Sequence, residues 1–174
     1  MTSTPERIVV YGVTGSGKST LAARIAERTG LPHVSADDLS WLPGWVAVPD
    51  DEQRRRIAEV CAGERWVLDA AYGKWRDLVL ARTQLVVGLD YPRWLSLGRL
   101  LRRTAARSLT RRRICNGNVE SVRQMFSADS IIRWHFTSFS TKRKRIRAWA
   151  AESPGPEIVR LTSPRATRRW LETL

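Results

Sequence analysis

The sequence predicts an α/β fold in which helices cover both faces of a five-stranded parallel sheet. Short β-branched segments alternate with amphipathic ones, and strands are expected at residues 7–11, 32–36, 65–69, 83–90 and 157–161. Such alternation is typical of parallel sheets, because helical crossovers join consecutive parallel strands. The 174 residues contain no internal repeat and no low-complexity linker. We therefore expect a single domain over residues 1–174.

The beginning of the chain carries the clearest strand and helix signals. Residues 7–11, Arg-Ile-Val-Val-Tyr, are mostly β-branched or aromatic and run straight into Gly12, as expected of a buried strand. From Ser19 onward, apolar residues recur at helical spacing until Gly30 and Pro32 end the helix. A strand, a glycine-rich turn and a helix are thus predicted in direct succession.

The remaining connections are expected to be one long loop and several helices. Residues 37–49 contain two prolines and a glycine, which predicts a loop. A long helix is expected after Tyr91-Pro92, with Trp94, Leu97, Leu101 and Ala105 forming one apolar stripe. A polar turn, Cys-Asn-Gly-Asn, follows at residues 115–118. Other helices are expected at residues 50–62, 74–82, 119–151 and 164–174.

Composition argues against secreted, membrane and metal-scaffold proteins. The first residues lack a long apolar run behind a basic segment, and no stretch approaches the roughly 20 apolar residues that span a bilayer. We therefore expect a cytoplasmic protein without a membrane partner. Cys61 and Cys115 stand in no CxxC or Cys/His spacing, which indicates neither a disulfide framework nor a zinc site.

The positive charge is concentrated in one segment. The chain carries a formal net charge of +13, and fourteen Arg or Lys residues lie between Arg99 and Arg147, against only Glu120 and Asp129. A localised field of this sign attracts polyphosphate or nucleic acid. The alternative interpretation is a solvated basic helix face. The position of the segment, residues 99–150 between the fourth and fifth strands, is compatible with a helical, arginine-rich lid.

The most specific motif is G-x-x-x-x-G-K-[ST], which residues 12–19 match between the predicted strand and helix. In such a loop, backbone amides and the helix N-terminus cradle phosphate oxygens. Lys18 would reach the β- and γ-phosphates of ATP, and the Ser19 hydroxyl would bind Mg²⁺. The sequence therefore predicts a P-loop NTPase fold with a nucleotide site formed by Gly12, Gly15, Ser16, Gly17, Lys18, Ser19 and Thr20.

Carboxylates follow two of the predicted strands at the edge where open α/β sheets bind ligands. Asp69 ends the third strand and is the expected second Mg²⁺ ligand. Asp37 and Asp38 follow the second strand, and one of them would orient an acceptor hydroxyl or accept its proton. A capping role is the alternative for each. Asp90 also ends a strand, where the nearby Pro92 equally suggests a turn and cap.

Arginines and aromatic residues complete the expected site. Arg99, Arg103 and Arg107 lie one helical turn apart, and we expect Arg103 and Arg107 to supply positive charge to the transferred group. Trp41 and Trp45 flank Leu-Pro-Gly near Asp37, where they form either a wall for an acceptor's base or sugar or simple loop packing. The two histidines, His33 and His135, stand alone and are expected to be structural.

These fragments, in this order, resemble adenylate-kinase-like P-loop kinases, and within them the topology modulation proteins. The resemblance rests on Gly-Val-Thr-Gly-Ser-Gly-Lys-Ser-Thr at residues 12–20, Asp-Asp-Leu-Ser-Trp-Leu-Pro-Gly-Trp at 37–45, and later segments at 66–72, 89–103, 115–121 and 160–171. It implies ATP at the loop, a lid in the arginine-rich segment, and adenine held between Arg103 and the loop from Ser163 to Arg165. The family commonly carries Gly-Asn where this chain has Ala70-Ala71.

Two functions therefore remain open at the level of sequence. The first is an ATP- and Mg²⁺-dependent phosphotransferase that acts on a small molecule or nucleotide. The second is a nucleotide-regulated nucleic-acid-binding protein with weak ATPase activity, whose basic residues 99–147 contact phosphates. Neither the acceptor nor the number of subunits follows from the sequence.

Overall fold

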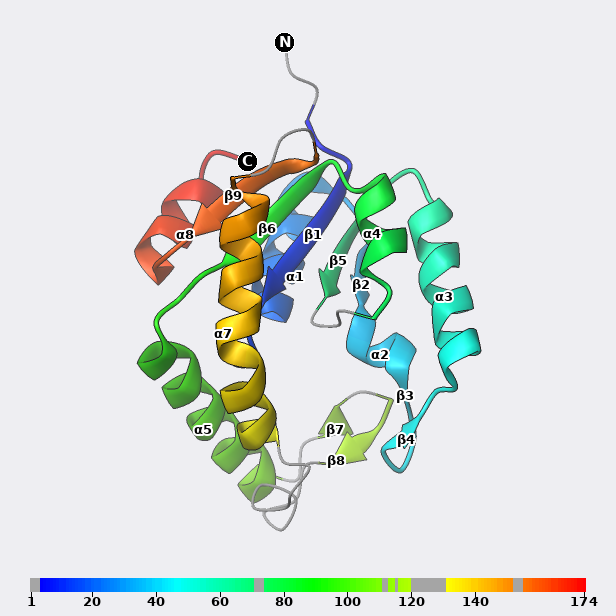
Figure 1. Ribbon diagram of the computed structural model, residues 1–174. Coiled ribbons are helices and arrows are strands. Elements are labelled where there is room, and N and C mark those ends of the chain that lie inside the picture. Colours follow the sequence, from blue (N-terminus) through cyan, green and yellow to red (C-terminus); the bar gives the residue numbers. More distant parts are fainter. Residues whose placement is uncertain (1–3, 71–73, 111–112, 115, 120–130, 152–154) are drawn as a thin grey trace.

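The computed structural model describes residues 4–70, 74–110, 113–114, 116–119, 131–151 and 155–174 (Figure 1). Its main sheet has the order β2-β5-β1-β6-β9, and every neighbouring pair is parallel. The strands are β1 (Arg7–Gly12), β2 (His33–Ser35), β5 (Trp66–Ala70), β6 (Leu85–Leu89) and β9 (Glu157–Leu161). The predicted five-stranded parallel sheet is confirmed.

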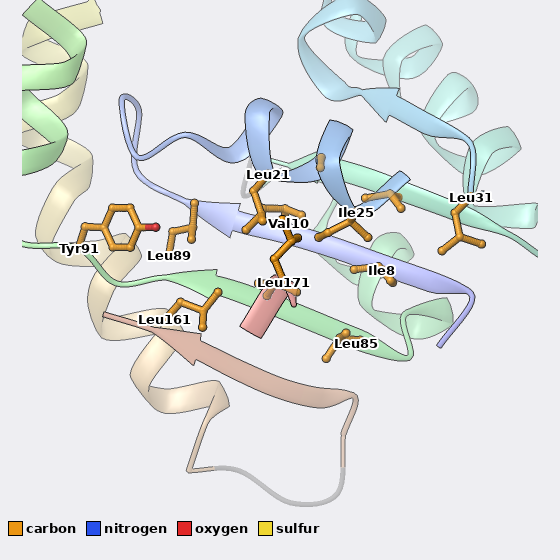
Figure 2. Close-up of a cluster of buried hydrophobic side chains, with 13 residues drawn as sticks. Ile8, Val10, Leu21, Ile25, Leu31, Leu85, Leu89, Tyr91, Leu161 and Leu171 are labelled. Carbon is orange, nitrogen blue, oxygen red and sulfur yellow. The ribbon is translucent and has the colours of Figure 1, made fainter. Parts of the chain in front are cut away.

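The central strand β1 separates two apolar cores, as the two-residue period of a strand requires. Ile8 and Val10 point to one face, where α1 (Lys18–Thr29) and α8 (Pro164–Leu171) pack (Figure 2). Val9 and Tyr11 point to the other face, which is covered by residues of α3 (Asp50–Ala62), α4 (Arg76–Arg82) and α7 (Ile131–Trp149). Helices thus lie on both faces of the sheet.

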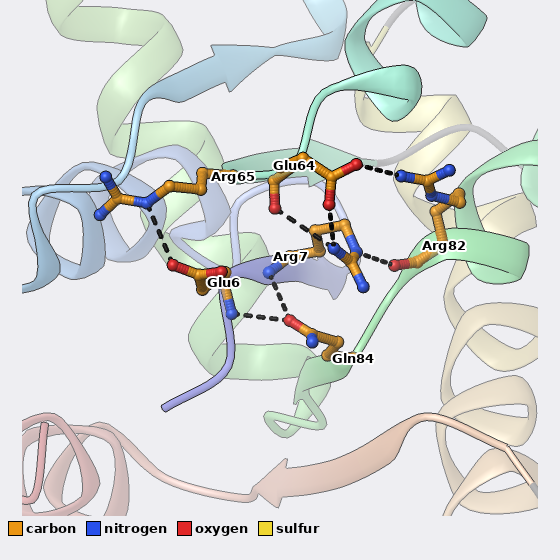
Figure 3. A network of polar contacts seen from close by, with 6 residues as sticks. All are labelled: Glu6, Arg7, Glu64, Arg65, Arg82 and Gln84. Atoms are coloured by element: carbon orange, nitrogen blue, oxygen red, sulfur yellow. Dashed lines mark hydrogen bonds and ion pairs between the residues drawn. The ribbon is translucent and has the colours of Figure 1, made fainter. Parts of the chain in front are cut away.

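A polar network closes the amino-terminal edge of the sheet (Figure 3). The Arg7 guanidinium donates to the backbone oxygen of Arg82 at 2.7 Å and to the Glu64 carboxylate at 3.2 Å. The Gln84 side-chain oxygen accepts from the backbone amides of Glu6 and Arg7 at 2.7 and 3.0 Å. These bonds fasten the starts of β1 and β6, so Arg7 serves the scaffold at the edge opposite the glycine-rich loop.

Residues 37–49, expected to form a loop, contain short regular elements instead. Helix α2 (Ala36–Ser40) is followed by the antiparallel pair β3 (Trp41–Leu42) and β4 (Val46–Ala47). The two strands leave room for a turn in which Gly44 has a φ of 81° and Trp45 a φ of 59°. The prolines and the glycine therefore lie in the turn of a hairpin and after its end. The presence of proline and glycine alone does not distinguish such a hairpin from an irregular loop.

The long helix after Pro92, α5 (Arg93–Thr110), presents a different face to the core than expected. Ser96, Leu100 and Thr104 are buried, whereas Trp94 is 73% exposed and Leu101 is 41% exposed. The backbone of the glycine-rich loop lies directly against this helix, because a Cβ at Gly15 would lie 2.3 Å from the backbone oxygen of Ser96 and 2.9 Å from the Cβ of Leu100. The predicted apolar stripe through Trp94, Leu97, Leu101 and Ala105 is therefore wrong.

The rest of the segment between β6 and β9 contains a hairpin and a second long helix. The hairpin pairs β7 (Arg113–Ile114) with β8 (Asn118–Val119). Val119, expected to begin a helix, belongs to β8, and the described part of the next helix is α7. The segment at 120–130 lies outside the described residues, as does Ala71. None of the described helices has the length and apolar character needed to cross a bilayer.

Candidate functional site

The glycine-rich loop between β1 and α1 requires glycine at two positions. Gly15 and Gly17 have φ angles of 82° and 96°, in the left-handed region that side chains disfavour. A Cβ at Gly15 would lie 2.3 Å from the backbone oxygen of Ser96 in α5. Gly17 is the N-cap of α1 and provides no side-chain cap, so the first amides of the helix face the loop. This conformation suits an anion at the helix N-terminus.

The loop is held by its own side chains as well as by backbone turns. The Ser16 hydroxyl donates to the backbone oxygen of Val13 at 2.7 Å, and the Lys18 ammonium donates to the same oxygen at 3.2 Å. Gly12 is packed just as closely, because a Cβ there would lie 2.8 Å from the Ser16 hydroxyl oxygen. Ser19 and Thr20, at the start of α1, are exposed. The loop is therefore held in shape by contacts within the protein.

Two helices from the arginine-rich segment contact this loop. Arg99 of α5 donates to the backbone oxygen of Ser16 at 3.2 Å. His135 of α7 is fully buried, and its Nδ1 lies 3.0 Å from the backbone oxygen of Thr14. Burial lowers the pKa of His135, which favours the neutral ring donating this bond. His135 was expected to be structural, and in the structure it positions α7 against the loop.

Asp69 lies at the carboxyl end of β5 and is only 5% exposed. Its carboxylate accepts a hydrogen bond from the Ala36 amide at 3.2 Å and lies 3.9 Å from His33 Nε2. Burial raises the pKa of Asp69, and the charge of Asp37 adds to the rise; a hydrogen bond from Ser19 opposes it. A cation bound at this carboxylate would relieve the cost of burying it.

Lys18, at the start of α1, lies near several charged side chains. Burial lowers its pKa, Asp37 and Asp69 oppose the shift, and Arg103 adds to it. The structure therefore brings Asp37, Asp69 and Arg103 within electrostatic reach of Lys18, although the four residues come from α2, β5, α5 and α1. Four of the residues singled out from the sequence thus meet at one edge of the sheet, beside Ser19.

The other expected site residues lie on α5 and at the start of α8. Arg107 is half-buried one turn beyond Arg103 in α5. Ser163 is the N-cap of α8, where its hydroxyl accepts from the Ala166 amide at 3.1 Å. Arg165 is exposed at the start of the same helix. The Ser163 hydroxyl is therefore already engaged in capping α8. It could contact a nucleotide only in addition to this hydrogen bond.

The donor set around Ser19 and Asp69 fits a magnesium ion. Mg²⁺ prefers hard oxygen ligands and is commonly held by one or two carboxylates together with phosphate oxygens and water. The Ser19 hydroxyl and the Asp69 carboxylate provide such donors next to the phosphate-loop amides. The described ranges contain no group of three or more His, Cys, Asp or Glu residues suited to a metal ion, so the donors here are a hydroxyl and a carboxylate that would need phosphate oxygens and water to complete the site.

Sequence reasoning missed a connection between the hairpin β7–β8 and residues 38–45, which include the end of α2 and the turn after it. The Asn116 amide donates to the backbone oxygens of Asp38 and Trp41 at 2.9 and 2.7 Å. Asn118 donates to the Leu42 oxygen at 3.0 Å and accepts from the Trp45 amide at 2.8 Å. We call these four bonds the asparagine latch. The Asn-Gly-Asn sequence signalled a turn, but not what the turn would contact.

Asp90 was expected to be a turn or cap residue, and the structure gives it another role. Its fully buried carboxylate accepts from Arg143 and, at 3.1 and 2.8 Å, from Arg147 and Arg160. Burial opposes its ionisation, but the three arginine bonds outweigh burial and hold the pKa of Asp90 below its usual range. Two arginines of the basic segment are therefore engaged inside the protein rather than facing a ligand.

Trp41 and Trp45 contact each other edge to face, with ring centroids 5.8 Å apart. Both rings are half-buried in the hairpin that follows α2. The contact agrees with the packing interpretation. That Trp41 and Trp45 form a wall for an acceptor stays a prediction. The two rings nevertheless lie in the segment that the asparagine latch attaches to the arginine-rich segment.

Comparisons by sequence give partial matches. No protein-family model matches the chain. The uncharacterized protein YqaC of Bacillus subtilis (strain 168) is 31% identical over 100 residues, covering 56% of each chain. tRNA dimethylallyltransferase 2 of Porphyromonas gingivalis is 42% identical over 64 residues, 35% of this chain and 21% of that protein. An adenylate kinase of Thermotoga neapolitana is 40% identical over 53 residues, 30% of this chain and 23% of that protein. The matches thus span about half of the first relative's length and less of the others.

Comparisons by structure cover nearly the whole chain. A gluconokinase from Sinorhizobium meliloti 1021 superposes with a TM-score of 0.54 at 19% identity, covering 97% of this chain and 95% of the other. A shikimate kinase from Acinetobacter baumannii, in complex with shikimate, superposes with a TM-score of 0.57 at 18% identity, covering 98% and 90%. The fold is that of P-loop kinases. At these identities the likeness establishes the fold and leaves the activity to be argued from the site.

Proposed function

We propose that this protein is an ATP- and Mg²⁺-dependent phosphotransferase whose acceptor is a small hydroxylated molecule or nucleotide. The observation that carries the proposal is the cluster of Lys18, Asp37, Asp69 and Arg103 beside a glycine-rich loop. A phosphate-binding loop with two carboxylates beside it, from β5 and from α2 after β2, provides a donor site and a means of aligning an acceptor. The P-loop kinase fold of the solved neighbours supports the same class of reaction.

The residues take distinct roles in the proposed reaction. The loop amides from Gly12 to Thr20 hold the phosphates, and Lys18 neutralises the β- and γ-phosphates. Ser19 and Asp69 hold Mg²⁺, which when bound offsets negative charge on the phosphates. Arg103 and Arg107 add fixed positive charge, and Ser163 and Arg165 are proposed to contact adenine.

Asp37 is proposed to orient the acceptor hydroxyl and take its proton. The acceptor oxygen then forms a bond to the γ-phosphorus while the bond from that phosphorus to the β–γ bridging oxygen breaks, leaving ADP. Trp41 and Trp45 would flank the acceptor. We also propose that the chain is related to the topology modulation proteins, which its sequence motifs resemble.

The test is an acceptor screen with MgATP. ADP formation is measured with nucleosides, nucleoside monophosphates, sugar acids and other hydroxylated metabolites, each against the rate without acceptor. The correct acceptor is expected to raise the rate, and Lys18→Ala to lower it by about 100-fold or more. Lys144→Ala, at an exposed lysine of α7, is the matched control. If the protein binds no nucleotide, or if no acceptor in a broad panel raises ADP formation, the phosphotransferase proposal is rejected.

A second candidate, nucleic-acid binding regulated by nucleotide, is favoured by exposed aromatic side chains on the basic helices. Trp94 of α5 and Trp134 and Phe136 of α7 are 73%, 52% and 47% exposed, and Arg93 lies over the Phe136 ring at 5.4 Å. Aromatic rings among cations are typical of surfaces on which single-stranded bases stack.

This candidate predicts steeply salt-dependent binding. A fluorescent single-stranded oligonucleotide should bind at about 50 mM salt and lose most of its affinity by about 200 mM. Trp94→Ala should weaken the binding by about tenfold, since stacking contributes about 1–3 kcal/mol per base. ATP should alter the affinity. Absence of binding even at the lower salt concentration would exclude this function.

A further inference from the structure

Lys142 of α7 is a buried cation that the sequence did not single out. The residue is only 4% exposed, and its ammonium nitrogen has no hydrogen-bond partner within the part of the chain that the structure describes. Its nearest aromatic contact is the ring of Trp134, at 5.6 Å from the nitrogen to the ring centroid. Lysine ammonium groups carry three donors and are rarely buried without acceptors. Such a side chain in a native site points to a missing anionic partner.

The surroundings of Lys142 locate that partner. Lys18 of α1 and Asp37 of α2 are the charges from neighbouring elements that act on it, and Arg145 acts from α7 itself. Burial is the main cause that lowers the pKa of Lys142 to about 7, and Lys18 lowers it further, whereas Asp37 opposes the shift. Lys18 and Lys142 are therefore close enough for the charge of one to affect the pKa of the other. An anion bound between them would interact favourably with both.

We propose that Lys142 is a direct ligand of the terminal phosphate of a bound nucleoside triphosphate, reaching it from α7 as Lys18 does from α1. The inference rests on the proposed function and extends it to a residue outside the glycine-rich loop. An anionic group of the acceptor is the competing occupant. The terminal phosphate is favoured because α7 lies against the glycine-rich loop: His135, two turns before Lys142 and also buried, contacts the backbone oxygen of Thr14.

The neighbouring contact of α7 with the loop is consistent with this assignment. His135 of the same helix packs against the loop through the backbone oxygen of Thr14, so the helix is fixed where a triphosphate would lie. A side chain of α7 that contacts only the terminal phosphate would let the protein distinguish ATP from ADP. The ratio of the affinities for the two nucleotides is thus the property to measure.

The experiment compares two nucleotides in three variants. Binding of Mg²⁺ with ADP, and with the non-hydrolysable analogue adenylyl imidodiphosphate, is measured by titration calorimetry for wild type, Lys142→Met and Lys142→Arg. Lys142→Met is expected to weaken the triphosphate analogue by about tenfold and ADP by less than about threefold. Lys142→Arg should retain most of the affinity. Lys144→Met, at an exposed lysine on the same helix, is the control and should match wild type.

A second readout tests the chemistry rather than the fold. Triphosphate binding to wild type at about pH 8 should take up a proton, seen as a dependence of the heat on the buffer's ionisation enthalpy. Lys142→Met should abolish that component. If both nucleotides lose the same factor, or neither changes, the assignment of Lys142 is overturned while the phosphotransferase proposal stands. If wild type binds neither nucleotide, the proposed function is overturned and the assignment with it.

Discussion

The buried amine of Lys142 makes a quantitative prediction about folding that needs no ligand. In the unfolded chain its pKa is near 10.5, and in the folded protein burial lowers it to about 7. Because the folded state binds its proton less tightly, Lys142 destabilises the protein fully below about pH 7 and less as the pH rises toward 10.5. The difference between the two pKa values corresponds to about 5 kcal/mol at the acidic limit.

Replacing Lys142 with methionine should therefore stabilise the protein, and more so in acid. From about pH 6 to about pH 8, the wild-type free energy of unfolding should rise by about 1.4 kcal/mol relative to that of Lys142→Met. Urea unfolding of both proteins at the two pH values measures the difference, in which other titrating groups such as His135 largely cancel. If the difference in free energy of unfolding between the two proteins changes by less than about 0.5 kcal/mol from about pH 6 to about pH 8, Lys142 titrates normally and the reasoning is refuted.

Three further substitutions test separate parts of the structure. Asp90→Asn should lower the free energy of unfolding by about 2–3 kcal/mol in urea unfolding, whereas Asp77→Asn, in an exposed ion pair, should change it by less than about 1 kcal/mol. Gly15→Ala should cost about 2 kcal/mol or more and abolish nucleotide binding, but Gly98→Ala, with open space around it in α5, should be neutral or stabilising in the same assay. Asn118→Ala should speed tryptic cleavage near the hairpin about tenfold, through the loss of two hydrogen bonds, and equal cleavage rates would contradict the latch.

The sheet could be predicted because its signals are local. Each strand is a short β-branched run, and the glycine-rich loop has a fixed spacing between a strand and a helix. The helix α5 shows where local reasoning failed. Its apolar stripe through Trp94 and Leu101 looked like a core face, but the glycine-rich loop packs at Gly15 against the face that carries Ser96 and Leu100. Sequence periodicity does not reveal which face of a helix a distant loop will contact.

The candidate site was predictable to the extent that its residues end strands or begin helices. Asp37 and Asp69 follow strands that the topology places side by side, so their proximity to Lys18 follows from the fold class. Lys142 carried no such signal, because a lysine in a basic run is usually exposed. Its burial depends on how α7 packs on the sheet. The pairing of Asp90 likewise depends on β9, more than 60 residues away in the chain.

The asparagine latch bears on how this protein could change its substrate during evolution. Asn116 and Asn118 bind backbone oxygens and a backbone amide of residues 38–45, so the four bonds do not depend on the identity of any side chain there. In the proposed reaction, substitutions at the side chains of residues 38–45 would alter what the acceptor contacts while leaving these bonds in place. Under that proposal, the residues that hold the segment differ from those that select the substrate, which makes the segment a target for redesigning specificity.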